Sequence, residues 1–102
     1  MTLSTHTDLS ALLPGLAPPS LDWEILSERA SSMGRAGRRI EAALAALDAF
    51  HGDPADREPL VREAADAVWS YFVQREMMGF ARHDDAIEAY RIPREVLRRV
   101  GC

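Results

Sequence analysis

The sequence has no lysine and a single cysteine, Cys102, which is its last residue. One thiol can form neither an internal disulfide nor a thiolate cage for a metal, so disulfide scaffolds and cysteine-based zinc folds are excluded. All 12 basic side chains other than histidine are arginine. Because alanine is also very frequent, codon bias in a GC-rich genome explains the arginine content more simply than selection for bidentate anion binding does.

Long apolar runs and an excess of positive charge are missing as well. No apolar run approaches the roughly 20 residues of a membrane-spanning helix. The N-terminus lacks the basic start and apolar core of a secretory signal, so we expect a cytoplasmic protein that does not enter a membrane. The formal net charge of -4 argues against a dedicated nucleic-acid binder, which needs a basic surface.

The length of 102 residues allows one domain and one core. Hydrophobic residues make up 47% and charged residues 27%, which is ordinary for a globular chain. Residues 1–19 are predicted to be a tail, since Pro14, Pro18 and Pro19 break any helix there. The leucines of this tail leave two alternatives, a solvated linker and a segment docked on the folded body. Residues 20–102 are predicted to form a single helical domain.

The first predicted helix begins at Ser20, a good N-cap followed by acidic residues in the first turn, and ends before Gly52 and Pro54. Its apolar and small residues alternate spacings of three and four, which is the pattern of a coiled-coil seam. We call this row the heptad seam; its members are Trp23, Leu26, Ala30, Met33, Gly37, Ile40, Leu44 and Leu47. The small residues Ala30 and Gly37 predict a close crossing with another element.

The second predicted helix begins between Asp53 and Pro59, because proline is tolerated in a first turn, and ends at Met78 with Gly79 as its stop. It is apolar over most of its circumference, which predicts a central place in the core. Its apolar members are Leu60, Val61, Ala64, Val68, Trp69, Tyr71, Phe72 and Val73.

Two short helices are predicted after a link through residues 80–83. Asp84 or Asp85 caps the first, and Pro93 opens the second, which Gly101 ends. No stretch alternates as a strand would. The predicted fold is therefore all-α, a long two-helix antiparallel hairpin with short C-terminal helices. We expect a bundle completed by a homodimer, since two apolar faces on one helix require two partners and about 80 folded residues cover little surface.

Three stretches of the sequence carry a resemblance: EILSERASSMGRAGRRIEAALAALDAF, EAADAVWSYFVQREMMGF and IEAYRIPREVLRRVG. They resemble a family of short, uncharacterised bacterial proteins classed as a domain of unknown function. The resemblance covers residues 21–101 and leaves out the tail. It implies a helical fold and carries no assigned activity, cofactor or catalytic residue.

The first candidate site is the arginine group Arg35, Arg38 and Arg39, which faces away from the heptad seam. No acid four residues away neutralises Arg35 or Arg39, and an unpaired arginine fork can bind a phosphate or the carboxylates of a partner. The plainer interpretation is a solvated helix face.

The second candidate is Arg75 with Glu76, two charged residues between apolar stretches. On a largely buried helix both cannot reach water unless the helix end emerges, so we expect a buried polar pair or a polar helix end.

A third candidate, residues 84–99, has the order helix, turn, helix, with Arg94, Arg98 and Arg99 on its second helix. Glu95 stands at helical spacing to pair with Arg98 or Arg99. Because the last helix is barely two turns long, a clasp that closes the core is favoured over a DNA-reading motif.

Catalytic, cofactor and metal sites are not predicted. The three histidines, His6, His51 and His83, lie far apart and lack the spacing that places two ligands on one helix face. The sequence favours a cytosolic protein-interaction or structural module, acting as a homodimer with or without a further protein partner, and not an enzyme. The alternative is a nucleic-acid-binding regulator that uses the arginine face or the C-terminal helices.

Overall fold

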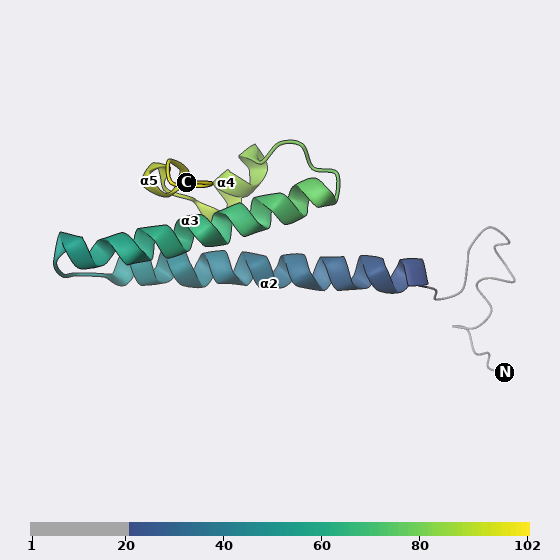
Figure 1. The fold of residues 1–102 in the computed structure, drawn as a ribbon, viewed down its shortest axis with the longest axis horizontal. Coiled ribbons are helices and arrows are strands. Elements are labelled where there is room, and N and C mark those ends of the chain that lie inside the picture. Colours follow the sequence, from purple (N-terminus) through teal and green to yellow (C-terminus); the bar gives the residue numbers. More distant parts are fainter. Residues whose placement is uncertain (1–20) are drawn as a thin grey trace, which may run out of the picture. The chain divides into compact units, whose positions relative to one another are not determined.

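The computed structural model describes residues 21–102, a range that contains helices α2 (Leu21–Ala49), α3 (Pro54–Met77), α4 (Asp84–Tyr90) and α5 (Arg94–Leu97) and no strand (Figure 1). The predicted all-α class is confirmed. The predicted tail and the Ser20 cap lie outside the described residues. Residues 21–30 belong to one unit of the chain and Ser31–Cys102 to another. Between residues 21 and 102, no helix combines the length and the apolar character that crossing a membrane requires.

Both ends of α3 follow the predicted signals. The Asp53 carboxylate accepts a hydrogen bond from the Ala55 N–H at 2.9 Å, and Pro54 occupies the first turn. Gly79, with φ of +99°, follows the last turn in a left-handed conformation that suits glycine. Pro59 lies inside the helix and not in its first turn, contrary to our expectation. The carbonyl it leaves without a donor belongs to Ala55, which is exposed and therefore open to water.

The two C-terminal helices differ from the prediction in their caps and lengths. The N-cap of α4 is His83, because the carboxylates of Asp84 and Asp85 bind Arg82 and Arg75. Helix α5 has four residues and does not continue to Gly101. After Arg98, the N–H groups of Arg99, Val100 and Cys102 bond to carbonyls three residues back, which is the tighter turn of a 3₁₀ type.

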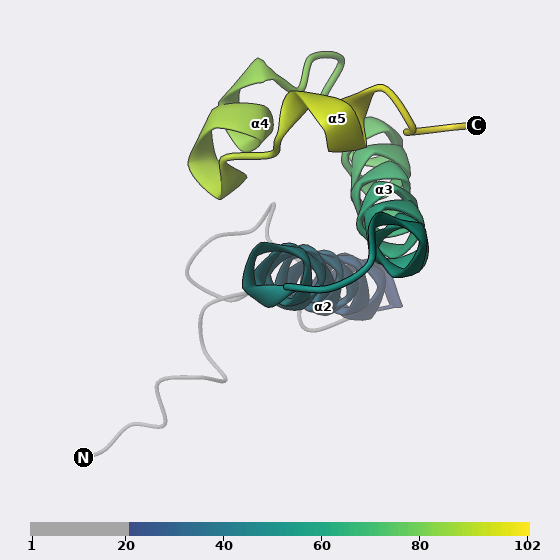
Figure 2. The same cartoon turned by 90° about the vertical axis from the view of Figure 1, so that its left-hand side faces the viewer.

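The core of the Ser31–Cys102 unit lies on α3. This helix packs along α2 as the predicted hairpin, and α4 and α5 lie across the remaining side of the pair (Figures 1 and 2). Ile40, Val68 and Val96 are the largest fully buried side chains and come from three different helices. Alanines at zero exposure, Ala64 and Ala67, allow this close packing. Trp69, predicted to lie in the core, is 50% exposed.

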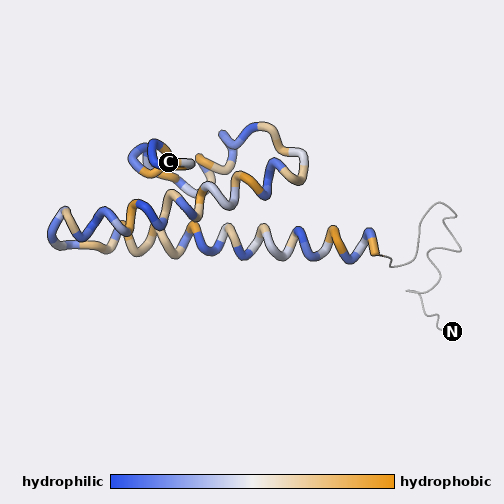
Figure 3. The backbone as a smooth tube through the Cα atoms, viewed as in Figure 1, coloured by the Kyte–Doolittle hydropathy of each residue, from blue (hydrophilic) through white to orange (hydrophobic). Residues whose placement is uncertain are grey.

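The heptad seam is buried along only part of its length. Gly37, Ile40 and Leu47 are buried, as predicted for the inward face. Trp23 and Leu26, from the same row, are 62% and 55% exposed. Hydropathy coloring shows apolar positions at the start of α2 as well as near the core (Figure 3). Only the second half of the seam, from Gly37 to Leu47, therefore faces the core of the chain.

Gly37 lies at a close approach, as predicted, but its neighbour is a side chain and not a helix backbone. A Cβ at this position would collide with the Tyr90 hydroxyl and would touch the Tyr71 ring at 3.8 Å. The two tyrosine rings meet edge to face, with centroids 5.5 Å apart. Burial, together with a hydrogen bond to Tyr71, raises the pKa of Tyr90. The absent side chain at Gly37 thus makes room for the residue that brings α4 against α2.

Replacing Gly37 with Ala or Leu should lower the free energy of unfolding by about 1–3 kcal/mol, because Tyr90 must move, although both replacements favour the helix. Gly34→Ala is the matched control, since a Cβ there would meet only the flexible Arg38 guanidinium at 3.6 Å. It should stabilise the chain by about 0.5–1 kcal/mol. Urea unfolding followed by circular dichroism measures both. A Gly37 variant as stable as the Gly34 variant would contradict this packing.

Candidate functional site

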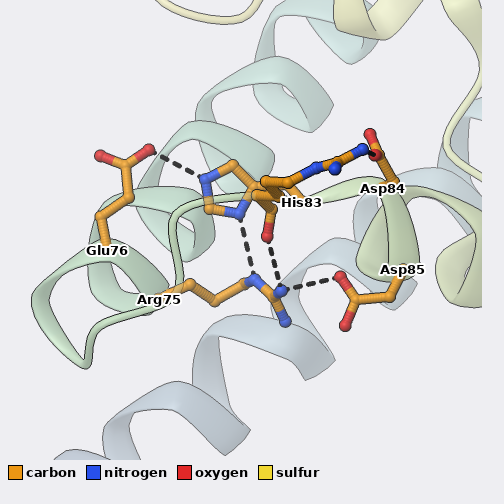
Figure 4. Close-up of polar contacts among 6 residues, drawn as sticks. Arg75, Glu76, His83, Asp84 and Asp85 are labelled. Atoms are coloured by element: carbon orange, nitrogen blue, oxygen red, sulfur yellow. Dashed lines mark hydrogen bonds and ion pairs between the residues drawn. The ribbon is translucent and has the colours of Figure 1, made fainter.

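The most elaborate polar contact in the described chain is centred on Arg75, near the end of α3 (Figure 4). Its side chain is only 8% exposed. The Nε–H donates to Nδ1 of His83 at 3.1 Å, and Nη2 donates to the Arg82 carbonyl at 3.0 Å and to Oδ1 of Asp85 at 2.8 Å. The guanidinium also lies 4.6 Å from the centre of the Phe80 ring. The buried charge is therefore compensated by one carboxylate and two neutral acceptors.

His83 joins this group through both ring nitrogens. A guanidinium can only donate, so Nδ1 must accept and carries no proton in this arrangement. The proton then sits on Nε2, which donates to Oε2 of Glu76 at 2.8 Å. The imidazole is 13% exposed and stacks on Phe72, with ring centres 4.1 Å apart and planes 3° from parallel. The contacts thus specify a neutral His83 in the Nε2–H tautomer.

We call Arg75, Glu76, His83 and Asp85 the Arg75 cluster. Its donors and acceptors are directed at one another and not at a common empty site, so the cluster has a structural role: it holds segments of the chain together. All four hydrogen bonds tie α3 to residues 82–85, which contain the link before α4 and its first two residues. The cluster therefore holds the start of α4 against the end of α3.

The predicted pair of Arg75 and Glu76 is placed in this cluster, but its members occupy different positions. Arg75 is buried, whereas the Glu76 side chain is 59% exposed, and each binds a different nitrogen of His83. The sequence placed His83 in the predicted link before the third helix, and Asp85 was interpreted only as a possible cap of that helix. A general signal was available in the sequence: a buried arginine needs acceptors, and after Glu76 the next acids along the chain are Asp84 and Asp85.

The arginine group on α2 is engaged in part. Nε and Nη2 of Arg39 contact Oε2 of Glu63 at 3.0 and 2.9 Å, so a carboxylate of α3 neutralises this guanidinium. The spacing along one helix could not show a partner 24 residues away. Arg35 and Arg38 are exposed. The three guanidinium groups therefore do not form one unpaired fork.

A second set of ion pairs ties the start of α3 to α5. Arg57 binds both carboxylate oxygens of Glu95, and Arg99 binds Glu58. The predicted pairing of Glu95 with Arg98 or Arg99 is wrong, because the acid turns toward α3. The hydrogen bonds from these arginines lower the pKa of Glu95 and of Glu58 below the ordinary value of 4.5.

A groove of about 430 Å³ lies beside these ion pairs. It is lined by Leu44, Ala45, Leu47, Asp48, Arg57, Tyr90, Arg91, Pro93 and Glu95. This volume falls within the range of small-molecule sites, roughly 300–1,000 Å³. However, Arg57 and Glu95 bind each other, so the wall they form is not aimed at a ligand. Within residues 21–102, no three His, Cys, Asp or Glu side chains are grouped to hold a metal ion.

The fold and the ion pairs define a small all-α hairpin domain with a C-terminal clasp. The family model described as a family of unknown function (DUF6665) matches residues 1–102, and the chain belongs to this family. The match includes the N-terminal tail, which the resemblance seen in the sequence left out. No curated protein and no solved structure matches the chain.

His83→Ala should lower the free energy of unfolding by about 1.5–3 kcal/mol, because a buried charged donor loses its acceptor. Asp85→Asn is the comparison: its side chain is 72% exposed and the amide oxygen can still accept from Arg75, so we expect a loss of about 1 kcal/mol or less. Chemical denaturation of both variants measures the difference. Equal, small losses would show that His83 does not support Arg75.

Stability should fall in acid because of Glu58 and Glu95. Their pKa values are lower in the folded than in the unfolded chain, so the unfolded chain binds more protons as the pH drops. The stabilisation is present above about pH 4.5 and is lost as the pH falls through the folded values. Urea unfolding at a series of pH values should show a shallower acid dependence for Glu95→Gln, and an unchanged one for the exposed control Glu88→Gln. Parallel curves for both variants would contradict the assignment.

Proposed function

We propose that this protein is a cytosolic protein-interaction or structural module that works as a homodimer. The observation that carries the proposal is the exposed start of α2. Four of its first six residues, Leu21, Trp23, Ile25 and Leu26, are large and apolar, and they are 71%, 62%, 40% and 55% exposed. Single exposed apolar residues are common on proteins, but four on two successive turns mark an interaction surface.

The energetics favour covering this segment. Fully burying one such side chain is worth about 1.5–3 kcal/mol, and a two-fold pair of chains gains each contribution twice. A second copy of the same chain is present wherever the protein is, so it is the simplest partner to cover this segment.

In addition, Met77 and Phe80 at the end of α3 are 66% and 44% exposed, which gives the Ser31–Cys102 unit an apolar surface of its own for a further protein partner.

The alternative of nucleic-acid binding has less support. Arg39 is bound to Glu63, and Arg99 to Glu58. Helix α5 is a single turn of four residues whose Val96 is buried, so it is too short to present a row of side chains to a DNA groove. Arg91, Arg94 and Arg98 are exposed, and they are the residues through which weak, salt-dependent binding would occur.

Light scattering on a size-exclusion column should give twice the chain mass at micromolar concentrations, with Cys102 kept reduced so that no intermolecular disulfide forms. Dilution should lower the average mass toward that of one chain, as mass action requires. The chain mass at every concentration would rule out the homodimer. A shift in mass on adding duplex DNA at physiological salt, absent for the free chain, would favour the alternative.

A further inference from the structure

We propose that the exposed half of the heptad seam pairs antiparallel with the same segment of a second copy. This inference rests on the homodimer proposed above and names its surface. The contact is made by Trp23 and Leu26 of one chain, with Trp23 of each copy facing Leu26 of the other. Asp22 and Arg29 flank it.

The exposed half of the seam continues a row of residues that already forms an interface within the chain. From Gly37 to Leu47 the row is packed against other helices, and Ile40 is completely buried. The same spacing of three and four runs toward the N-terminus through Met33, Ala30 and Leu26 without a break in α2. A row with this period fits another helix, because only a helix repeats its side chains at the same interval. The occupant of the exposed half is therefore helical.

The exposed half of the seam also carries charges of opposite sign along one edge. Asp22 precedes Trp23 and Arg29 precedes Ala30, so both stand at the same heptad position on one edge of the seam, one heptad apart. When two such helices run antiparallel, these edges face each other. The register that sets Trp23 against Leu26 of the other copy also sets Asp22 against the other copy's Arg29, twice in the dimer. The segment is thus complementary to itself in charge as well as in shape.

This arrangement also satisfies two-fold symmetry. Each contact between one residue and a second is repeated with the copies exchanged, as an isologous interface requires. The contact is short, so the dimer should dissociate on dilution, as small interfaces do.

The test begins with Leu26→Asp, which places a charge in the contact of each copy. We expect the dissociation constant of the dimer, measured by light scattering or sedimentation, to rise on the order of 100-fold or more. The matched control is Met77→Asp, at another exposed large apolar residue, on α3, which should leave the dimer unchanged. Both sites are on the surface, so circular dichroism should show that both variants keep their helices.

Charge exchange tests the orientation. Asp22→Arg and Arg29→Asp should each weaken the dimer roughly 5-fold or more, since like charges then face each other, and the double variant should restore it. A double variant that is no better than the singles would overturn the antiparallel register.

The outcomes separate this inference from the proposed function. A monomeric wild-type chain would remove both. A dimeric wild type that keeps its affinity in Leu26→Asp and loses it in Met77→Asp would overturn the surface named here and leave the homodimer standing.

Discussion

The burial of one positive charge controls how the C-terminal third of this protein is placed. Arg75 lies on the buried face of α3, in line with Val61 and Val68, so its guanidinium needs hydrogen-bond acceptors there if the end of α3 is to stay folded. The acceptors are His83, the Arg82 carbonyl and Asp85, so the chain has to return to α3 directly after Gly79. That return sets the start of α4. From there Tyr90 reaches the space left by Gly37 on α2.

The clasp is thus held at two ends by different means. At the α4 end a buried guanidinium and a neutral imidazole are shielded from water, and their hydrogen bonds are specific in direction. At the α5 end the pairs of Arg57 with Glu95 and Arg99 with Glu58 are half exposed, so solvent and salt screen them. Between the two ends Ile92 and Val96 are buried in the core. Apolar burial supplies most of the stability, and the polar ends select this arrangement of the short helices.

The heptad seam shows how one sequence pattern can serve two roles. Its second half is buried in the core of the chain, whereas the large apolar side chains of its first half are exposed to solvent. The period is the same in both halves, since it reflects the helix and not the identity of the partner. A seam longer than the elements available to cover it is a frequent sign of association between chains.

The sequence alone determined the two long helices and both ends of α3, because these depend on neighbours within a few residues. Asp53 and Pro54 start α3, Gly79 follows its end, and the alternating spacing of the seam marks α2 as a long helix. Gly37 was identified as a close contact for the same local reason, the lack of a side chain. Only the tertiary structure decided which charges meet between different helices. Glu63 binds Arg39 across 24 residues and Glu95 binds Arg57 across 38, and no spacing rule along one helix reaches that far. It also decided that Arg75 is buried while the adjacent Glu76 is exposed, since successive residues on a helix point about 100° apart and only the packing of α4 determines which direction is covered.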